Sequence, residues 1–186
     1  MDEHLKERLI SSRTVFEGKL IAVRVDEVEL PNGTRTTREI VPHPGAVAIV
    51  PLLDDGRVVM IRQYRHAAGK VLWELPAGLI EEGEEPEQAA RRELAEEVGY
   101  EAGHLELLLS AYLSPGFSCE VAHVFLGLGL QKVEARGEAD ETIHAVSLAL
   151  SEAVEMVRRG EVQNAAAICG LLAAARWERE GGITDS

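Results

Sequence analysis

The sequence predicts an α/β protein with a mixed β-sheet. Stretches with the apolar patterns of strands are intermixed along the chain with segments that carry helix start and stop signals. The 186 residues can bury a sizeable core, and a content of 46% apolar and 27% charged residues is typical of a globular protein. We therefore expect one main domain, with an arm before it.

The N-terminal part predicts a β-hairpin. Residues 1–15 are polar and give no prediction, but residues 20–30 alternate between apolar and polar, as a half-buried strand does. Pro31-Asn32-Gly33 is a turn signal, and residues 34–41 form the expected return strand. We assign residues 1–44 to this arm, residues 45–182 to the main domain and residues 183–186 to a frayed tail.

The main domain should contain several strands followed by two helices. Strands are expected over residues 47–53, 58–65, 104–113, 121–130 and 143–150. Ser151 is a suitable N-cap for a helix that Gly160 ends, and Asn164 for a second helix that ends at Gly181-Gly182. Residues 134–141 read as an acidic loop.

Charge and composition argue against several classes of protein. The formal net charge of −13 disfavours binding to nucleic acid or to an anionic membrane. No apolar run approaches the roughly 18 residues of a membrane span, and the start MDEHLKERLI lacks the features of a signal peptide, so we expect a cytoplasmic protein. The two cysteines have no metal-ligand spacing, and no GxSxG motif indicates a serine hydrolase.

The stretch from Gly78 to Tyr100, GLIEEGEEPEQAARRELAEEVGY, carries most of the chemical information. Pro86 suits the first turn of a helix and Gly99 its C-terminal end. Within this helix Glu93, Glu96 and Glu97 share one face, and an apolar stripe lies beside them, formed by Ala90, Leu94 and Val98.

Three clustered glutamates repel one another unless something neutralises them. A hard divalent cation such as Mg²⁺ or Mn²⁺ does so through oxygen ligands, and Arg92, four residues before Glu96, can hold that side chain by pairing. The alternative is that the glutamates form an ordinary solvated helix face.

The spacing favours the metal site. The segment reads Gly78, five residues, Glu84, seven residues, Arg92-Glu93-Leu94, one residue, Glu96-Glu97, one residue and Gly99-Tyr100. At every fixed position it resembles the signature of the Nudix hydrolases, which cleave a nucleoside diphosphate linked to another moiety. The resemblance implies a loop–helix–loop that binds divalent cations and a pyrophosphate, within a Nudix-type α/β/α sandwich.

Further stretches resemble the ADP-ribose pyrophosphatase branch of that family. They are FEGKL at 16–20, REIVPHPGAVAIV at 38–50, RQYR at 62–65, ELPAGLIEEGE at 74–84, NAAA at 164–167, and Pro115, which follows Tyr100 by 15 residues. The resemblance implies Mg²⁺-dependent hydrolysis of ADP-ribose to AMP and ribose 5-phosphate. Another nucleoside diphosphate sugar, such as GDP-mannose or ADP-glucose, is the closest alternative, and a non-catalytic sensor domain is a more distant one.

The resemblance also implies roles for individual residues. The metal ligands would be the backbone carbonyl of Ala77 with Glu93, Glu96 and Glu97. Arg92, Glu96 and Glu97 would serve catalysis, together with Glu138 or Glu141 in the acidic loop as the group that acts on the attacking water. The substrate contacts would be Phe16, Arg38, Arg65, Gly78, Leu79, Pro115 and Glu120. The hairpin would cross to a partner subunit, which implies a homodimer.

Overall fold

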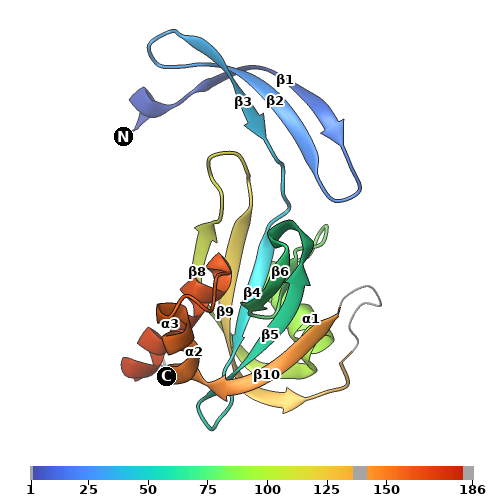
Figure 1. Cartoon of the computed structure of the whole chain (residues 1–186). Coiled ribbons are helices and arrows are strands. Elements are labelled where there is room, and N and C mark those ends of the chain that lie inside the picture. Colours follow the sequence, from blue (N-terminus) through green and yellow to red (C-terminus); the bar gives the residue numbers. More distant parts are fainter. Residues whose placement is uncertain (1, 136–141, 182–186) are drawn as a thin grey trace. The chain divides into compact units, whose positions relative to one another are not determined.

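A computed structural model describes residues 2–135 and 142–181, and the chain divides into two compact units (Figure 1). The first unit comprises Met1–Pro44 and Tyr112–Val121, and the second comprises Gly45–Ala111 and Ala122–Ser186. The first unit therefore includes a second segment, 112–121, in addition to the N-terminal residues that the sequence assigns to the arm.

The first unit is built on a three-stranded antiparallel sheet with strand order β1-β2-β3. Its elements are a short 3-10 helix (Glu3–Leu5), β1 (Arg8–Glu17), β2 (Ala22–Glu29) and β3 (Arg35–Ile40). The hairpin expected from the sequence is confirmed as β2 and β3, and the Gly33 N–H donates to the Leu30 carbonyl at 2.9 Å in its turn.

Strand β1 was not predicted, because residues 1–15 carry no strand pattern. Almost every residue of β1 is exposed, so the strand has no buried face that would require alternating apolar residues. The strand is held by its backbone pairing with β2 over the whole range from Arg8 to Glu17. Such a strand is specified by its neighbour and not by its own pattern.

Backbone hydrogen bonds join the two segments of the first unit. The Val41 N–H donates to the Phe117 carbonyl at 2.7 Å, and the Cys119 N–H donates to the Val41 carbonyl at 3.1 Å. A turn at Ser114-Pro115-Gly116 is closed by the Phe117 N–H, which donates to the Ser114 carbonyl at 3.1 Å.

In its described residues the second unit contains two sheets and three α-helices. One sheet has the order β10-β5-β6 and the other the order β7-β4-β9-β8, in which β4 and β9 run parallel and β4 and β7 antiparallel. The elements are β4 (Ala46–Pro51), β5 (Arg57–Arg65), a 3-10 turn (His66–Ala68), β6 (Lys70–Glu74), β7 (Ala77–Leu79), α1 (Pro86–Val98), β8 (Tyr100–Tyr112), β9 (Val121–Lys132), β10 (Ile143–Ala149), α2 (Leu150–Arg158) and α3 (Ala165–Arg179).

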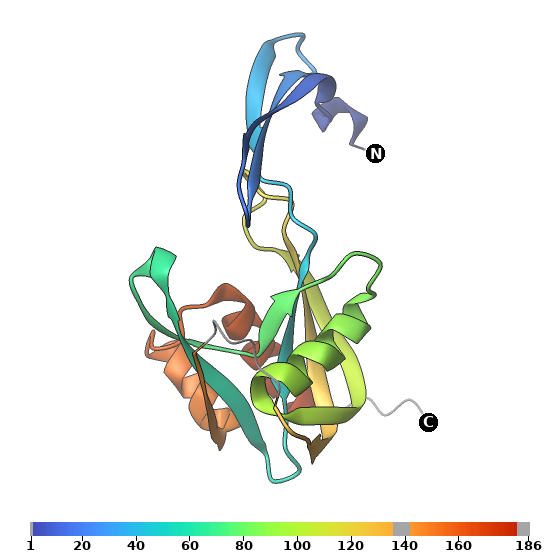
Figure 2. The ribbon, with the colours of Figure 1, turned by 90° about the vertical axis from the view of Figure 1, so that its right-hand side faces the viewer.

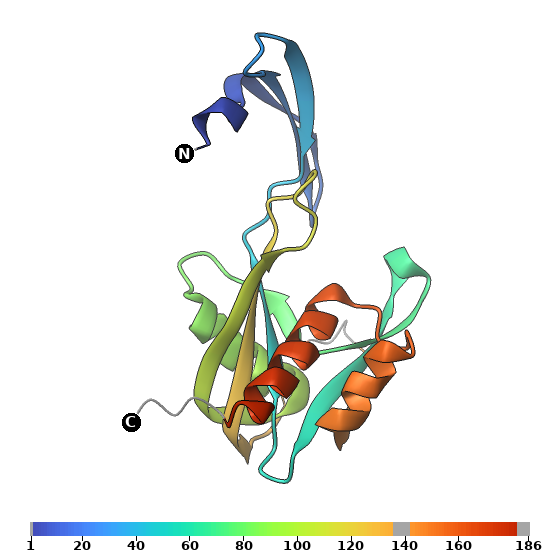
Figure 3. The same cartoon turned by 90° about the vertical axis from the view of Figure 1, so that its left-hand side faces the viewer.

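Helices cover both faces of the sheet that contains β4. Val47 and Ile49 pack in one apolar cluster with residues of α1, whereas Ala48 and Val50 pack in another with residues of α2 and α3. Figure 2 shows α1 in front of the strands, and Figure 3 shows α2 and α3 on the opposite side. Because successive strand residues point to opposite faces, a strand buried on both faces reads as the continuous apolar run seen at the start of the domain. The mixed-sheet α/β/α sandwich is therefore confirmed.

Three local features of the second unit differ from the prediction. Strand β6 was missed because its first residues are exposed and it lacks apolar alternation. Strand β7 was missed because it is only three residues long and lies in a stretch broken by Pro76 and Gly78. The N-cap of α2 is Ala149, not Ser151, and the helix begins at the buried Leu150, whose N–H donates to the Gly56 carbonyl at 3.1 Å. Burial of Leu150 thus overrides the local cap preference.

The predicted start of α3 and end of α2 are confirmed, whereas α3 ends at Arg179, before the predicted Gly181-Gly182, of which Gly182 lies outside the described residues. The Asn164 side-chain oxygen accepts from the Ala167 N–H at 3.0 Å at the start of α3. Gly160, with a φ of +74°, follows the end of α2. The tail 183–186 and most of the acidic loop, residues 136–141, lie outside the described residues. Among the helices that are described, none is long and apolar enough to cross a membrane.

Candidate active site

Helix α1 presents its carboxylates on the side away from the core. The helix begins with Pro86 after the N-cap Glu85, whose N–H donates to the Gln88 side-chain oxygen at 3.0 Å, and it ends at Gly99 with a φ of +68°. The small side chains of Ala89 and Ala90, together with Leu94, are fully buried against the sheet. These contacts fix the rotation of the helix about its axis and therefore the direction of its polar face. Both helix ends agree with the sequence prediction.

Two glutamates of α1 meet strand β7 at consecutive residues. The Glu97 carboxylate accepts a hydrogen bond from the Ala77 N–H at 2.8 Å. The Glu93 carboxylate lies so close to Gly78 that a Cβ atom at position 78 would overlap with it. A side chain at position 78 would therefore require the Glu93 carboxylate to shift from its present position. Ala77, Gly78, Glu93 and Glu97 together form one compact polar corner, which we call the α1–β7 corner.

Arg92 links the glutamates of this region. Its guanidinium donates to both oxygens of Glu84 at 3.0 Å, to Glu93 at 2.6 Å and to the Leu79 carbonyl at 2.9 Å, and it reaches Glu96 at 3.3 Å. The sequence predicted only the pairing with Glu96, four residues away. Glu84 lies in the loop before the helix and Leu79 in β7, so helical spacing could not reveal these contacts.

These contacts set the charge states around Arg92. The hydrogen bond from Arg92 holds the pKa of Glu84 below its ordinary value, and the same bond raises the pKa of Arg92 above its own. Both groups therefore stay charged at neutral pH. The positive charge of Arg92 reduces the repulsion among the clustered glutamates that we expected from the sequence.

The carboxylates of α1 suit a hard divalent cation. Glu93, Glu96 and Glu97 offer only carboxylate oxygens, and the Glu96 side chain is 39% exposed while that of Glu93 is 12% exposed. As the described side chains stand, no three His, Cys, Asp or Glu residues form a group that could hold a metal ion, since Arg92 draws Glu93 and Glu96 toward itself. Glutamates reorient by rotation between staggered side-chain conformers, so the oxygens can turn toward a cation.

Four of the expected substrate contacts lie in the first unit. Phe16 is exposed on β1, Pro115 is exposed, and Glu120 is half-buried in the segment joined to Val41. Arg38 on β3 forms two hydrogen bonds with Glu7, of 2.6 and 3.1 Å. Arg38 is thus already held by a carboxylate, which the sequence did not predict.

The other three expected contacts lie in the second unit. Gly78 and the exposed Leu79 belong to β7, and Arg65 ends β5. The Arg65 guanidinium donates to the buried carboxylate of Glu74, with a shortest distance of 2.7 Å. Sequence reasoning missed Glu74 because the pair forms across the β5–β6 hairpin. The sequence offered one indication, which is that the charged residue Glu74 begins the ELPAG stretch. Glu138 and Glu141 lie outside the described residues.

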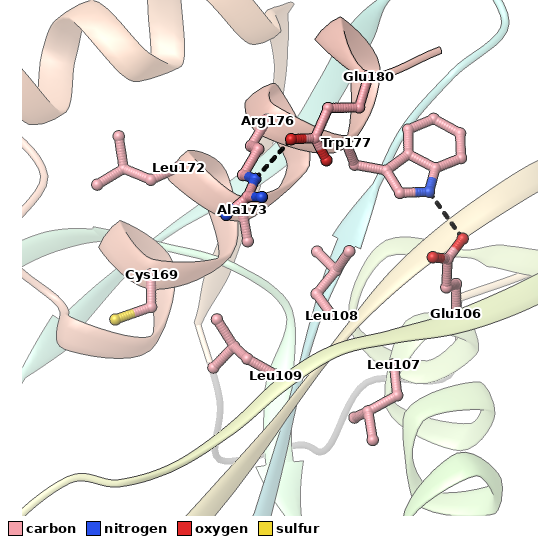
Figure 4. A pocket seen from close by; sticks show the side chains of 10 residues that line it. All are labelled: Glu106, Leu107, Leu108, Leu109, Cys169, Leu172, Ala173, Arg176, Trp177 and Glu180. Atoms are coloured by element: carbon pink, nitrogen blue, oxygen red, sulfur yellow. Dashed lines mark hydrogen bonds and ion pairs between the residues drawn. The ribbon is translucent and has the colours of Figure 1, made fainter. Parts of the chain in front are cut away.

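A separate hollow of about 580 Å³ lies between β8 and α3 and has a mainly apolar lining (Figure 4). Leu108 and Leu109 of β8 face Leu172 and Ala173 of α3 across it. At one end the Trp177 indole N–H donates to Glu106 at 2.8 Å. The lining of this hollow includes none of the residues of the α1–β7 corner, so the two are separate features of the second unit.

Comparison with known proteins shows which family has this arrangement. The NUDIX domain model matches residues 42–168, more than half of the chain and with the whole α1–β7 corner inside it. The chain belongs to the Nudix family. A second model, the nucleoside diphosphate sugar hydrolase N-terminal domain, matches residues 7–41. The two matches meet close to the boundary between the first and second units.

Individual Nudix relatives match along most of the chain. An ADP-ribose pyrophosphatase of Bacillus subtilis (strain 168) is 43% identical over 163 residues, which are 87% of this chain and 88% of that protein. An ADP-ribose pyrophosphatase of Mycobacterium tuberculosis (strain ATCC 25618 / H37Rv) is 47% identical over 169 residues, which are 88% and 81% of the two chains. A crystal structure described as an ADP compounds hydrolase superposes with a TM-score of 0.86 at 26% identity and covers 95% of this chain and 96% of that one.

Membership gives the α1–β7 corner a chemical meaning. The chain is a Nudix pyrophosphohydrolase, and hydrolases of this family generally use a divalent metal ion. The carboxylates of α1 lie on the segment that carries the family signature, so this corner is the candidate active site.

Proposed function

We propose that this chain hydrolyses the pyrophosphate bond of ADP-ribose, giving AMP and ribose 5-phosphate, in a Mg²⁺-dependent reaction. The observation that carries the proposal is the complete set of signature carboxylates on α1, held against β7 by the Ala77 and Gly78 contacts. The relatives named ADP-ribose pyrophosphatase support the substrate, because their similarity extends over 87% and 88% of the chain.

Glu93, Glu96 and Glu97 would hold the cation, with the backbone carbonyl of Ala77 as a further oxygen ligand. When bound, Mg²⁺ neutralises charge on the pyrophosphate oxygens and makes a water molecule more acidic. Mn²⁺ prefers the same oxygen ligands and is expected to substitute for it.

The chain's own residues would bind and orient the substrate around this centre. Arg92 joins α1 to the preceding loop through Glu84 and to β7 through Leu79, and it would serve catalysis by fixing the carboxylates. Gly78 and Leu79 would contact the substrate through β7. Arg65 would bind phosphate oxygens, for which a planar guanidinium is well suited.

The group that activates water is proposed from the sequence alone. Glu138 or Glu141 would orient the attacking water or accept its proton, with Glu138 preferred, and both lie outside the described residues. Comparison of kcat for Glu138→Gln, Glu141→Gln and the double variant tests this assignment. Unchanged kcat in all three would move the role to Glu96.

The partner of the first unit would be a second copy of the chain. Among its described residues Val28 is the one apolar side chain that is buried, whereas several large apolar side chains are exposed. We propose a homodimer in which the N-terminal sheets are exchanged, so that Phe16, Arg38, Pro115 and Glu120 contribute to substrate binding. The cytoplasmic location stays a prediction from the sequence.

A substrate panel tests the proposed function. ADP-ribose, ADP-glucose and GDP-mannose are compared by kcat/KM at equal Mg²⁺, with phosphate release from the products by a phosphatase as the readout. We expect ADP-ribose to exceed the other two by at least about tenfold, since a site that hydrogen-bonds one substrate rejects analogues that leave its polar groups unpaired. A higher kcat/KM for GDP-mannose or ADP-glucose would overturn the assignment of ADP-ribose as the substrate. No turnover of any of the three would favour a non-catalytic sensor.

A further inference from the structure

The β5–β6 hairpin carries an ion pair with a buried carboxylate, which lies outside the Nudix signature segment Gly78–Tyr100. The Glu74 side chain is 2% exposed, whereas that of its partner Arg65 is 42% exposed. Arg65 donates from Nε to both oxygens of Glu74, at 3.2 and 3.1 Å, and from Nη2 at 2.7 Å. One edge of the guanidinium is therefore bound to Glu74, and the Nη1 side of this planar group points away from that carboxylate.

Strand register shows which face of the hairpin carries this pair. Ile61 pairs with Glu74, Gln63 with Leu72 and Arg65 with Lys70. Paired residues of an antiparallel sheet point to the same face, and so do alternate residues along a strand. Gln63, Arg65 and Glu74 therefore share one face of the hairpin, and the Arg65 side chain reaches back along it to meet Glu74.

This face of the β10-β5-β6 sheet lies on the side of α1. Val59, which alternates with Gln63 and Arg65 along β5, lines a hollow together with Val98 and Gly99 at the end of α1. Val58 and Met60, on the opposite face, pack instead with α2 and α3. The pair thus lies on the same side of the sheet as the helix that carries the signature carboxylates.

The two arginines of the RQYR stretch are separated by the sheet. The Arg62 guanidinium lies 5.2 Å from the centre of the Trp73 ring, and Trp73 packs against the cluster of α2 and α3. Arg62 therefore belongs to the opposite face. Of the two, only Arg65 is on the α1 side.

Glu74 is also connected to the candidate active site through the backbone. Leu75 and Pro76 alone separate it from Ala77, whose N–H donates to Glu97. This connection is fixed on both sides, because Leu75 is buried in the core and the Pro76 carbonyl accepts from the Ile49 N–H at 2.9 Å. The position of the Glu74 carboxylate is thus set relative to the α1–β7 corner.

A second polar group on the same face supports a binding role for this region. Gln63 is 8% exposed, and its side-chain oxygen has no hydrogen-bond partner among the described residues. Most buried polar atoms in proteins are hydrogen-bonded, and the exceptions gather at sites that take a ligand or a water molecule. The face that carries Glu74 and Arg65 therefore has a hydrogen-bond acceptor that no described residue of the fold uses.

Stability alone gives little reason to keep the pair. Removing a carboxylate from water costs free energy that its attraction to an arginine often only offsets, and apolar replacements of similar volume are frequently as stable. What a buried carboxylate does provide is a fixed orientation for its partner.

We propose that Glu74 is a positioning residue that holds the Arg65 guanidinium toward the substrate pyrophosphate. The proposal rests on the proposed function, since it assigns to Arg65 a contact with the phosphates. Glu74 acts through Arg65 and does not touch the substrate, because its carboxylate is buried and both of its oxygens are bonded to Arg65.

The charge of the pair predicts how Glu74→Gln should act. The variant keeps the shape of the side chain and leaves the positive charge of Arg65 in place, so attraction for an anionic substrate remains. The fixed direction of the guanidinium is lost, and misplacement of a binding group affects the transition state most. We expect kcat to fall by at least about tenfold while KM changes by less than about threefold.

The experiment measures kcat and KM for ADP-ribose in the wild type, Glu74→Gln, Arg65→Gln and the double variant, with thermal unfolding of each. If Glu74 acts through Arg65, the double variant is no slower than Arg65→Gln alone, and Glu74→Asp recovers part of the lost kcat. Glu106→Gln is the matched control, because it removes a part-buried carboxylate that accepts from Trp177 on the α3 side, and its kcat should stay at the wild-type value.

Two results would overturn the positioning role. Glu74→Gln with a lower melting temperature but unchanged kcat would make the pair purely structural. Losses that multiply in the double variant would show that Glu74 acts independently of Arg65. If the wild type prefers another nucleoside diphosphate sugar, the same comparison on that sugar still decides the role of Glu74, while the proposed substrate alone fails.

Discussion

At the scale of single residues, the candidate site depends on one arginine and one glycine. Arg92 allows three carboxylates, from α1 and the loop before it, to gather around its guanidinium without strong repulsion. Gly78 leaves the space that the Glu93 carboxylate occupies. Each residue therefore acts by what it permits its neighbours to do, and each can be tested by a small change.

Gly78→Ala should remove activity without unfolding the protein. A methyl group at this position would overlap with the Glu93 carboxylate, which must then shift away from β7. We expect kcat to fall by about a hundredfold, as for the loss of one charged group that stabilises the transition state. The matched control is Gly127→Ala, whose Cβ would meet Ile49 and Leu130 at 3.5 Å, an ordinary contact, so its kcat should stay unchanged. Equal activity in the two variants would contradict the role given to Gly78.

The pair of Glu84 and Arg92 predicts how stability depends on pH. The hydrogen bond from Arg92 lowers the pKa of Glu84 in the folded state, so its contribution is present above the ordinary glutamate pKa and is lost as the pH falls through the lowered one. The wild type should therefore lose more unfolding free energy than Glu84→Gln between about pH 5 and pH 3. Urea unfolding across this range, in the presence of a chelator, measures the difference. Parallel curves for the two proteins would refute it.

At the scale of elements, the sequence predicts what local chemistry decides. The ends of α1 follow from Pro86 and Gly99, and the start of α3 follows from the Asn164 cap. Strands β1, β6 and β7 escaped prediction because pairing with a neighbour specifies them, with no apolar alternation of their own. The three residues 149–151 show the same competition, since burial of Leu150 places the helix start before the residue with the better cap.

The two caps in the C-terminal part provide a direct comparison. Asn164→Ala removes a side chain that accepts from the Ala167 N–H and should cost about 1 kcal/mol of unfolding free energy. Ser151→Ala should be close to neutral, because Ser151 is exposed and already inside α2. Chemical denaturation of both variants checks this. A loss in Ser151→Ala as large as that in Asn164→Ala would restore the cap that the sequence suggested.

The same distinction applies to the candidate site. The common face of Glu93, Glu96 and Glu97 could be predicted, because helical spacing determines it. The pairing of Arg92 with Glu84 and that of Arg65 with Glu74 could not, because each joins two elements. The partners of each pair are separated along the sequence and meet only after the loop folds onto the helix or the two strands pair.

At the scale of the whole molecule, the first unit predicts self-association. It buries little apolar surface within itself, and Leu20 is 83% exposed on it. Sedimentation velocity at micromolar concentration should give twice the mass of the 20.3 kDa chain. Leu20→Glu should weaken the dimer, because a charge at this position would have to lose its water on burial in the interface. Leu172→Glu, which changes an exposed leucine of α3 outside the first unit, should not. A fully active monomer would contradict the exchange of the N-terminal sheets.

The central claim is that the carboxylates of α1 hold a cation that the hydrolysis of ADP-ribose requires. Phosphorus NMR of the reaction with Mg²⁺ follows the wild type and Glu97→Gln directly, since AMP and ribose 5-phosphate give separate signals. We predict equal amounts of the two products from the wild type, none after addition of a chelator, and a kcat about a hundredfold lower in Glu97→Gln, because the substitution keeps the size of the side chain and removes its charge. Unchanged turnover in Glu97→Gln with Mg²⁺, or a wild type that leaves ADP-ribose intact, would contradict the claim.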